Sequence, residues 1–303
     1  MNFQHPVRNP RPRPGVLSPM KTFFILLLMG SLAHGAELSS KKHVRYQNTA
    51  GASVLRQILD VHYDASSTKT AKPVILWVHG GAWKFGNKTH SIGPKAKAFT
   101  EAGYVLVAMN YRFYPKASWK DQAGDVAAAA KWIQQNISAY GGDPKRMILM
   151  GHSAGAHLAA LTAADPSYLK KAGVPYNHIK AAVLLDGAGY DLPAVMNTSA
   201  GKHLKLYQEV FGNDPAQLKA ASPNHQFSKK RPAPDYLIIP VSNREITQLQ
   251  SNNLAKTIKN SGNHAEVHVA RNRTHMTLNQ KIGHPGDTPT KVILKFLKAR
   301  LSK

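Results

Sequence analysis

Cysteine is absent from this 303-residue chain. Its absence excludes disulfides, a thiol nucleophile and any zinc or iron–sulfur site built on cysteine. Acidic residues are scarce too, because 16 Asp and Glu stand against 40 Lys and Arg, which gives a formal net charge of +24. Long apolar runs are also missing: the segment 23–29 is too short to span a bilayer, so we expect no stable membrane span.

The excess of basic residues would permit binding to nucleic acid or to an anionic surface. However, the basic residues are scattered, and their longest run is the Lys-Lys-Arg of residues 229–231. Aromatic residues do not alternate with them as they do in proteins that bind single strands. We therefore interpret the charge as a solvated basic surface and expect no nucleic-acid partner.

The N-terminal 35 residues differ from the rest of the chain. Residues 2–19 are rich in Pro and Arg and lack periodicity, which predicts disorder. From Met20 to about Gly35 a basic start, an apolar run and small residues two apart are typical of a secretory signal peptide. We expect a secreted or periplasmic protein, with Met1 or Met20 as the start of translation. A buried N-terminal helix or a membrane anchor is the alternative.

Residues 36–303 contain no repeat and no internal linker, which favours a single domain. Strand and helix patterns alternate along it, which predicts an α/β fold with a mostly parallel central sheet covered by helices on both faces. Strands are expected near 58–63, 74–78, 104–109, 147–150, 181–185, 236–241 and 265–270. Helices are expected at 94–101, from 121 or 122, and at 154–164, 248–261 and 289–301.

Two stretches of this domain carry no regular pattern. Residues 36–57 are polar and are expected to be loose. Residues 190–234 are broken by Pro, Asn and Gly and contain only short helical pieces. We interpret 190–234 as an insertion at the rim of the active site, acting as a lid, where substrate choice would be made.

A Gly-His-Ser-Ala-Gly motif at residues 151–155 joins an apolar strand to an alanine-rich helix. A serine on such a sharp turn holds its hydroxyl above the sheet, and the flanking glycines remove Cβ atoms that would collide there. The motif predicts a nucleophile elbow with Ser153 as the nucleophile. Upstream, the strand 74–78 runs into two glycines, whose backbone N–H groups can point into a cleft. Gly81, Ala82 and Ala154 are the predicted donors of an oxyanion hole; a tight turn without a ligand is the alternative for the first two.

A serine hydroxyl needs a base to take its proton and a third group to orient that base. His275 follows the last expected strand in a polar loop and satisfies the chain order of serine, acid and histidine. His152 is expected to pack or hydrogen-bond within the elbow, and His79 to brace the oxyanion loop. His264 and His268 have the spacing of a metal pair on a helix, but on a strand they would be roughly 13 Å apart, so we expect no metal site.

Five motifs in the expected order carry a family resemblance: residues 74–83, 110–112, 140–144, 151–157 and 275–279. Together they resemble the carboxylesterase branch of the α/β-hydrolases. They are most similar to its feruloyl-esterase-like, kynurenine-formamidase-like and isoprenylcysteine-methylesterase-like members. The resemblance covers about residues 58–301. It implies an eight-stranded, mostly parallel sheet, no cofactor, and hydrolysis of an ester or an activated amide through an acyl-enzyme.

The resemblance also implies an acid after the strand 236–241, eight residues before a Ser at the start of the next helix. Counting back from Ser251 leads to Asn243, an amide in place of a carboxylate. Glu245 lies two residues further on and has a longer reach. Three possibilities follow: Glu245 orients His275, Asn243 orients it, or the enzyme is slow.

The sequence therefore predicts a serine hydrolase that cleaves a small-molecule carboxylic ester, without metal or cofactor. An arylformamidase-type amide hydrolase would use the same residues, although secretion argues against it because tryptophan breakdown is intracellular. A catalytically weakened, hydrolase-fold binding protein is the third hypothesis, suggested by Asn243 and the positive charge. Arg271 and Arg273 flank the histidine and either attract an anionic substrate or face solvent. The sequence indicates no oligomeric state.

Overall fold

A computed structural model describes residues 1–3, 9, 11, 36–69, 71–198, 201–229 and 231–301. The chain divides into a unit of residues 1–33 and a unit of residues 34–303, and the fold below belongs to the second. The expected signal peptide, from Met20 to about Gly35, and most of the disordered extension expected before it lie outside the described residues. None of the helices in the described ranges is long and apolar enough to cross a bilayer.

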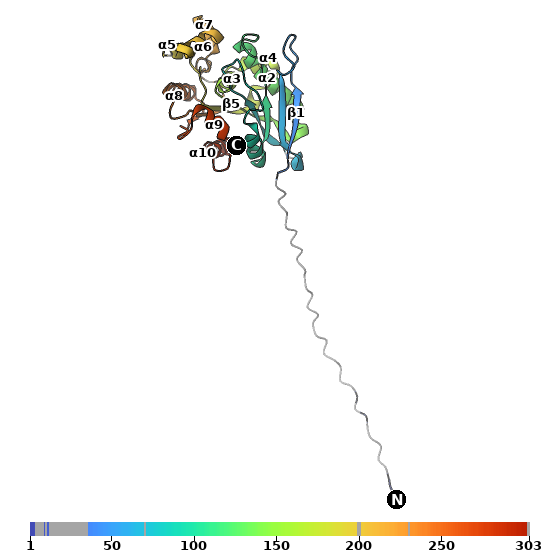
Figure 1. Ribbon diagram of the computed structural model, residues 1–303. Coiled ribbons are helices and arrows are strands. Elements are labelled where there is room, and N and C mark those ends of the chain that lie inside the picture. The colour runs from blue at the N-terminus through green and yellow to red at the C-terminus, as the bar shows by residue number, and fades with distance from the viewer. Residues whose placement is uncertain are drawn as a thin grey trace. The chain divides into compact units, whose positions relative to one another are not determined.

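A central sheet of eight strands organises the second unit, in the order β1-β2-β4-β3-β5-β6-β7-β8 (Figure 1). Its strands are β1 (Leu38–Arg45), β2 (Ile58–Asp64), β3 (Lys72–Val78), β4 (Val105–Met109), β5 (Gly142–His152), β6 (Ile179–Leu185), β7 (Asp235–Ile239) and β8 (Ala265–Val267). Strand β2 is antiparallel to both of its neighbours, β1 and β4. The pairs from β4 to β8 are all parallel. The predicted mostly parallel sheet is therefore confirmed.

Helices cover both faces of this sheet. They are α1 (Ile92–Glu101), α2 (Trp119–Asn136), α3 (Ala154–Ala164), α4 (Pro166–Ala172), α5 (Leu192–Thr198), α6 (Gly201–Phe211), α7 (Pro215–Ala221), α8 (Glu245–Asn260), α9 (His275–Lys281) and α10 (Thr288–Leu301). Alternate strand residues point to opposite faces, so Leu76 lies in a core formed with α2, α3 and α8. Its neighbours Ile75 and Trp77 lie in the second core, with α1, α9 and α10.

The first strand corrects the expectation that residues 36–57 are loose. Residues Leu38–Arg45 form β1, which pairs with β2 at the edge of the sheet. Most of its side chains are exposed, and the register shifts between Lys41 and Val44. An edge strand with few buried side chains is held by backbone pairing and needs no apolar pattern. The polar composition of this segment therefore did not reveal it.

The segment 190–234 contains α5, α6 and α7, which Figure 1 shows grouped together away from β1. These helices are short, in agreement with the broken pattern of the sequence.

Strand β8 ends at Val267, three residues before the expected end, and only an isolated bridge between Val241 and Ala270 continues it. Helix α2 begins at Trp119, before the expected start, because Ser118 and Asp121 form a capping box.

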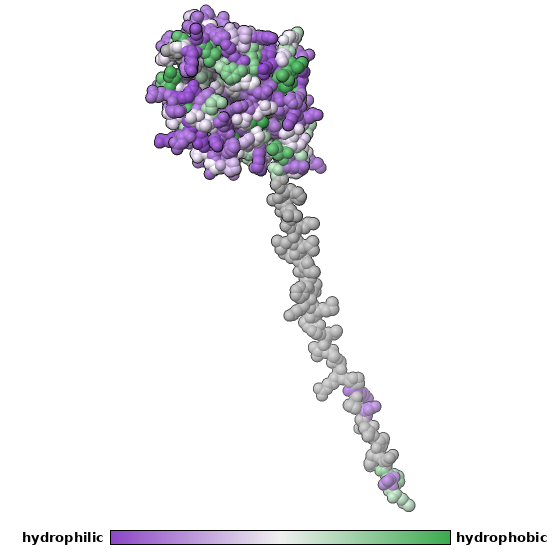
Figure 2. Space-filling view, viewed as in Figure 1, coloured by the Kyte–Doolittle hydropathy of each residue, from purple (hydrophilic) through white to green (hydrophobic). Residues whose placement is uncertain are grey.

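Most of the surface visible in Figure 2 is hydrophilic, and the apolar patches on it are small and separate. Several of the large apolar side chains exposed in the second unit lie beside cavities. Phe85 and Met276 line one cavity, and Ile246 lines another. Both cavities border the residues described next.

Candidate active site

The site lies at the carboxyl ends of β3, β5 and β6. Strand β3 pairs with β4 on one side and β5 on the other, so the connections diverge there and leave a crevice beyond the strand ends. The register places Val78 beside Gly151 and His152 beside Leu185. Ser153 and Asp186 are therefore the first residues beyond two neighbouring strands and lie level with each other.

Ser153 occupies a sharp turn between β5 and α3, with a φ of 55° and a ψ of −123°. Its backbone N–H donates to the carbonyl oxygen of Leu185 at 2.9 Å. A Cβ on Gly151 would lie 2.3 Å from the carbonyl oxygen of Gly155, and a Cβ on Gly155 would lie 2.1 Å from that of Val78. Both glycines are required because the turn brings the helix against two strand ends. The neighbouring structure holds Ser153 in a backbone conformation that is rare for a residue with a side chain.

His275 and Ser153 are brought together by the fold, 122 residues apart in sequence. The Nε2 atom of His275 lies 3.0 Å from Ser153 Oγ, and its Nδ1 lies 2.6 Å from Asp186 Oδ2. His275 was expected in a loop, but it is the first residue of α9, and the preceding residue, Thr274, caps this helix together with Thr277. The imidazole is thus carried by a capped helix end, which fixes its direction.

His152 supports His275 from within the elbow. Its Nε2 donates to the backbone carbonyl oxygen of His275 at 2.8 Å, and the two ring centroids are 4.5 Å apart. Burial, the largest effect, and the charge of the adjacent His275 together lower the pKa of His152 to about 3. His152 therefore stays neutral at neutral pH and acts as a hydrogen-bond donor, as the sequence predicted.

Asp186 is the carboxylate beside His275, and sequence reasoning missed it in this role. Its side chain is fully buried, and Oδ1 accepts from the N–H of Val241 at 3.2 Å and from Thr247 Oγ1 at 3.0 Å. Oδ2 accepts from His275 and, at 2.6 Å, from Arg244 Nη1. Burial alone would raise the pKa of Asp186, but the hydrogen bond from His275 and the charge of Arg244 outweigh it and lower the pKa to about 2.

Asn243 and Glu245 do not take the position expected for them. Both line a different cavity, together with Arg244, and no hydrogen bond between described residues joins either of them to His275. The acid follows β6, the strand next to β5, and not β7. The expectation is corrected because the register sets Asp186 level with Ser153, where a buried carboxylate directly faces the imidazole.

The loop after β3 carries the predicted oxyanion donors Gly81 and Ala82. Its backbone has positive φ at Gly81 (132°), Ala82 (50°) and Trp83 (61°), and a Cβ on Gly81 would lie 1.9 Å from the carbonyl oxygen of Phe85. Among the hydrogen bonds of the described residues, none uses the N–H of Gly81, Ala82 or Ala154. Three backbone donors near Ser153 are therefore available to an oxygen of a substrate.

His79 braces this loop, as the sequence predicted. Its Nδ1 donates to the carbonyl oxygen of Gly80 at 2.7 Å, and its ring stacks on Tyr111 with centroids 4.5 Å apart. The loop forms one wall of a cavity of about 350 Å³ that contains Ser153. Phe85 and Met276 also line this cavity, so a largely apolar group can lie next to the serine hydroxyl.

Lys95 is a buried amine near the site. Its Nζ donates to the carbonyl oxygens of Ser91 at 2.9 Å and of Asn279, in α9, at 2.5 Å, and it lies 4.9 Å from the centre of the Trp77 ring. These contacts tie α9, which begins with His275, to α1. Burial is the largest effect and lowers the pKa of Lys95 to about 7, although the charge of Asp287 acts in the opposite direction.

A pH-dependent stability follows from Lys95. The pKa of the Lys95 amine is lower in the folded state than its value of about 10.5 in the unfolded state. The contribution of Lys95 to the free energy of unfolding is therefore complete above pH 10.5 and is lost as the pH falls toward 7. We expect a slope of up to about 1.4 kcal/mol per pH unit in this window. Urea denaturation at pH 7, 8, 9 and 10 should show a shallower slope for Lys95→Met than for the wild type. Parallel pH curves for the two proteins would contradict this account.

The remaining candidates have partners of other kinds. His264 Nε2 lies 2.8 Å from Glu266 and also contacts Arg300, and within the described ranges no group of three or more His, Asp or Glu is arranged to hold a metal. Arg273 pairs with Asp287 at 2.8 Å, whereas Arg271 is exposed. Arg271 is therefore the freer of the two basic residues that flank the histidine.

The fold and the residues at the carboxyl edge of its sheet define an α/β-hydrolase. Residues 59–258 match the BD-FAE family, and the chain belongs to this family of α/β-hydrolases. The family relationship predicted from the five sequence motifs is therefore confirmed.

Three curated relatives indicate the range of this similarity. The probable carboxylic ester hydrolase LipM of Mycobacterium tuberculosis is 36% identical over 155 residues, which cover 50% of this chain and 36% of LipM. A probable isoprenylcysteine alpha-carbonyl methylesterase of Arabidopsis thaliana is 27% identical over 270 residues, covering 84% of this chain and 56% of the relative. Kynurenine formamidase of Salmo salar is 34% identical over 161 residues, covering 53% of this chain and 51% of the relative. The chain thus spans only part of the length of each.

Solved structures agree on the fold. Esterase B from Lactobacillus Rhamnosis superposes with a TM-score of 0.71 at 21% identity, covering 88% of this chain and 85% of that chain. A truncated carbohydrate esterase from gut microbiota superposes with a TM-score of 0.71 at 24% identity, covering 89% and 98%. Both similarities extend over nearly the whole second unit and support the α/β-hydrolase architecture.

Proposed function

We propose that this protein is a serine hydrolase that cleaves small carboxylic esters through an acyl-enzyme. One observation carries the proposal: a single imidazole, His275, lies 3.0 Å from Ser153 Oγ and 2.6 Å from Asp186 Oδ2. With the proton on Nδ1 held by Asp186, Nε2 is free to accept the serine proton. A serine, a base and a buried carboxylate in this order are what nucleophilic catalysis by a hydroxyl requires.

In the proposed reaction Ser153 Oγ attacks the ester carbonyl carbon while its proton passes to His275 Nε2. The carbonyl oxygen becomes an oxyanion, which accepts hydrogen bonds from the N–H groups of Gly81, Ala82 and Ala154. The C–O bond to the alcohol breaks, and the alcohol leaves with the proton from Nε2. A water molecule then attacks the acyl-enzyme, gives its proton to His275, and releases the acid as the proton returns to Ser153.

A second candidate function is hydrolysis of an arylformamide by the same residues. It is supported by the similarity to kynurenine formamidase of Salmo salar. The similarities to a probable carboxylic ester hydrolase and to a probable methylesterase favour the ester. Rates on N-formylkynurenine and on short acyl 4-nitrophenyl esters distinguish the two, because the better substrate identifies the bond that the site cleaves.

The proposal is tested with a fluorophosphonate probe, which labels only an activated serine. We expect labelling of the wild-type protein that is lost in Ser153→Ala, together with hydrolysis of 4-nitrophenyl butyrate. The matched control is Ser251→Ala, because Ser251 is also buried but lies in α8 and has no hydrogen-bond partner among the described residues. Wild-type protein that neither reacts with the probe nor cleaves any ester would instead support a hydrolase-fold binding protein.

A further inference from the structure

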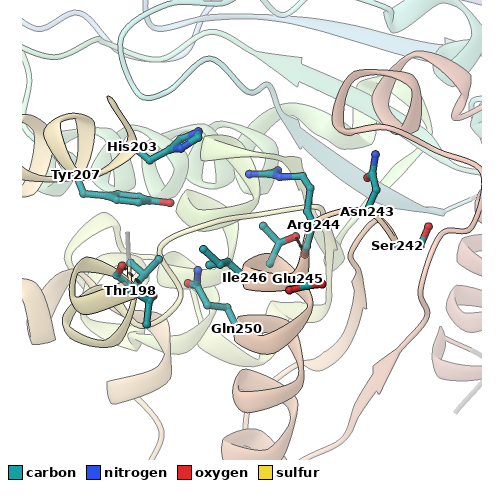
Figure 3. Close-up of a pocket in the computed structure, with 11 residues that line it drawn as sticks. Thr198, His203, Tyr207, Ser242, Asn243, Arg244, Glu245, Ile246 and Gln250 are labelled. Atoms are coloured by element: carbon teal, nitrogen blue, oxygen red, sulfur yellow. Dashed lines mark hydrogen bonds between the residues drawn. The ribbon is translucent and has the colours of Figure 1, made fainter. Parts of the chain in front are cut away.

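A second cavity, of about 470 Å³, shares no lining residue with the cavity that contains Ser153 and is lined by Arg244, whose guanidinium contacts His275. One wall comes from the insertion, with Val195, Thr198, His203 and Tyr207. The opposite wall is the start of α8, including Arg244 (Figure 3). Arg244 Nη1 lies 2.7 Å from His275 Nδ1, so this cavity borders the proposed catalytic residues directly.

Arg244 offers most of its hydrogen-bonding capacity to this cavity. A guanidinium has five N–H donors, and within the described residues only Nη1 of Arg244 has a hydrogen-bond acceptor, Asp186 Oδ2; the same Nη1 lies 2.7 Å from His275 Nδ1. The side chain is 33% exposed. Nε and Nη2 are therefore free to bind a planar carboxylate with two parallel hydrogen bonds.

Two further polar groups point toward the same space. Figure 3 shows the Tyr207 hydroxyl and the His203 ring directed toward the Arg244 guanidinium from the opposite wall. Tyr207 is only 8% exposed, and its hydroxyl has no hydrogen-bond partner among the described side chains and backbone groups. Burial raises the pKa of Tyr207, although the charge of Arg244 acts in the opposite direction, so the hydroxyl remains a donor at neutral pH.

Among the described residues that line this cavity, Glu245 is the one carboxylate. Figure 3 shows its oxygens beside the start of α8, turned away from the Arg244 guanidinium. Among the ion pairs of the described part of the chain, none joins Glu245 to Arg244. Among the described residues Arg244 thus forms an ion pair with Asp186, on the side of His275, and with no carboxylate that lines the cavity.

The position of Arg244 is unfavourable for a substrate that carries no charge. When Nε2 takes the serine proton, the imidazole becomes positively charged, and a guanidinium 2.7 Å away opposes this change. Arg244 and His275 also share one oxygen, Asp186 Oδ2. An anionic group bound to the free side of Arg244 would offset its charge and remove this penalty.

The geometry points to the second cavity as a subsite for an anionic group of the substrate, a carboxylate bound by Arg244 with a hydrogen bond from Tyr207. This inference rests on the proposed function and specifies its substrate class as esters that carry a carboxylate. Arg244 would then bind substrate, and through its contact with His275 it would make the reaction faster for an anionic ester than for a neutral one.

The test compares esters of matched size with and without the charge. On the acyl side the pair is 4-nitrophenyl hydrogen adipate and 4-nitrophenyl hexanoate. On the alcohol side it is 4-carboxyphenyl butyrate and 4-carbamoylphenyl butyrate. We expect one pair to favour the anionic ester in kcat/KM, and Arg244→Gln to lower that ratio by about 10- to 100-fold. For the neutral ester of that pair, Arg244→Gln should raise kcat.

Three further variants make the result specific. Arg244→Lys keeps the charge and should retain part of the preference, and Tyr207→Phe should lower it by several-fold without removing a charge. Arg271→Gln is the matched control, because it removes the same charge from an exposed position outside both cavities. An equal loss of kcat on charged and neutral esters in Arg244→Gln would overturn the inference, because Arg244 would then only position Asp186.

A binding measurement separates this inference from the proposed function. In Ser153→Ala, which cannot turn over, adipate should raise the melting temperature, and adding Arg244→Gln should abolish the rise. If the protein hydrolyses charged and neutral esters with the same kcat/KM, and adipate does not raise its melting temperature, the anionic subsite is wrong but the proposed function still holds. Loss of probe labelling and of all ester hydrolysis would overturn the proposed function, while the adipate experiment would still decide whether the cavity binds an anion.

Discussion

Replacing Asp186 with Asn should lower kcat for ester hydrolysis by about 10⁴-fold, the loss seen when the acid of a serine-protease triad becomes an amide. Asp186 accepts from His275 Nδ1 at 2.6 Å and is fully buried, so no water can replace it. An amide can present its NH₂ group to Nδ1, which holds the proton on Nε2 and prevents that nitrogen from accepting the serine proton. The measurement is kcat on 4-nitrophenyl butyrate, with circular dichroism to verify the fold.

The two residues first expected as the acid supply the controls for this experiment. Asn243→Asp and Glu245→Gln should change kcat by only a few-fold, since neither side chain is hydrogen-bonded to His275 in the described structure. If Glu245→Gln lost as much rate as Asp186→Asn, or if Asn243→Asp gained a large factor, the acid would lie after β7. The position of Asp186 after β6 would then be structural.

The sequence predicted the parts of the site that depend on local patterns. The flanking glycines and the preceding apolar run predicted the position of Ser153, and the strand that ends three residues earlier predicted that of Gly81. Such signals are visible because strand β5 and helix α3 are buried along most of their length, and burial requires uniformly apolar residues. The helix 154–164 was predicted with the same bounds as α3 for this reason.

Which residue serves as the acid depends on the order of the strands in the sheet, and local sequence patterns do not reveal that order. Asp186 directly follows the expected strand 181–185, and nothing near it in the sequence distinguishes it from other polar residues at strand ends. Both β6 and β7 end at the same edge of the sheet, and the family resemblance favoured the second. The decisive facts are the pairing of His152 with Leu185 and the hydrogen bond from His275, which come only from the fold.

Replacing Lys88 with Met should destabilise the protein by about 3–5 kcal/mol, because it leaves the charge of Asp60 buried and unpaired. The two side chains are 1% and 3% exposed, and Lys88 Nζ lies 2.7 Å from Asp60 Oδ2. The backbone N–H of Lys88 also donates to Asn110 Oδ1 at 2.7 Å. This network connects β2 and the end of β4 to the segment beyond the oxyanion loop. Chemical denaturation monitored by fluorescence would measure the loss.

The interpretation of that loss depends on a second substitution at the partner. Asp60→Asn removes the charge but keeps an acceptor for the N–H of His43, which donates to Asp60 Oδ1 at 2.7 Å. If the cost in Lys88→Met is an uncompensated charge, the double variant should be more stable than Lys88→Met alone. Lys97 and Glu101 form an exposed pair, so Lys97→Met should cost less than about 1 kcal/mol. If the losses of the two single variants simply add in the double variant, the cost of Lys88→Met comes instead from lost packing around the lysine stem. Asp60→Asn removes only the unpaired charge and cannot restore that packing.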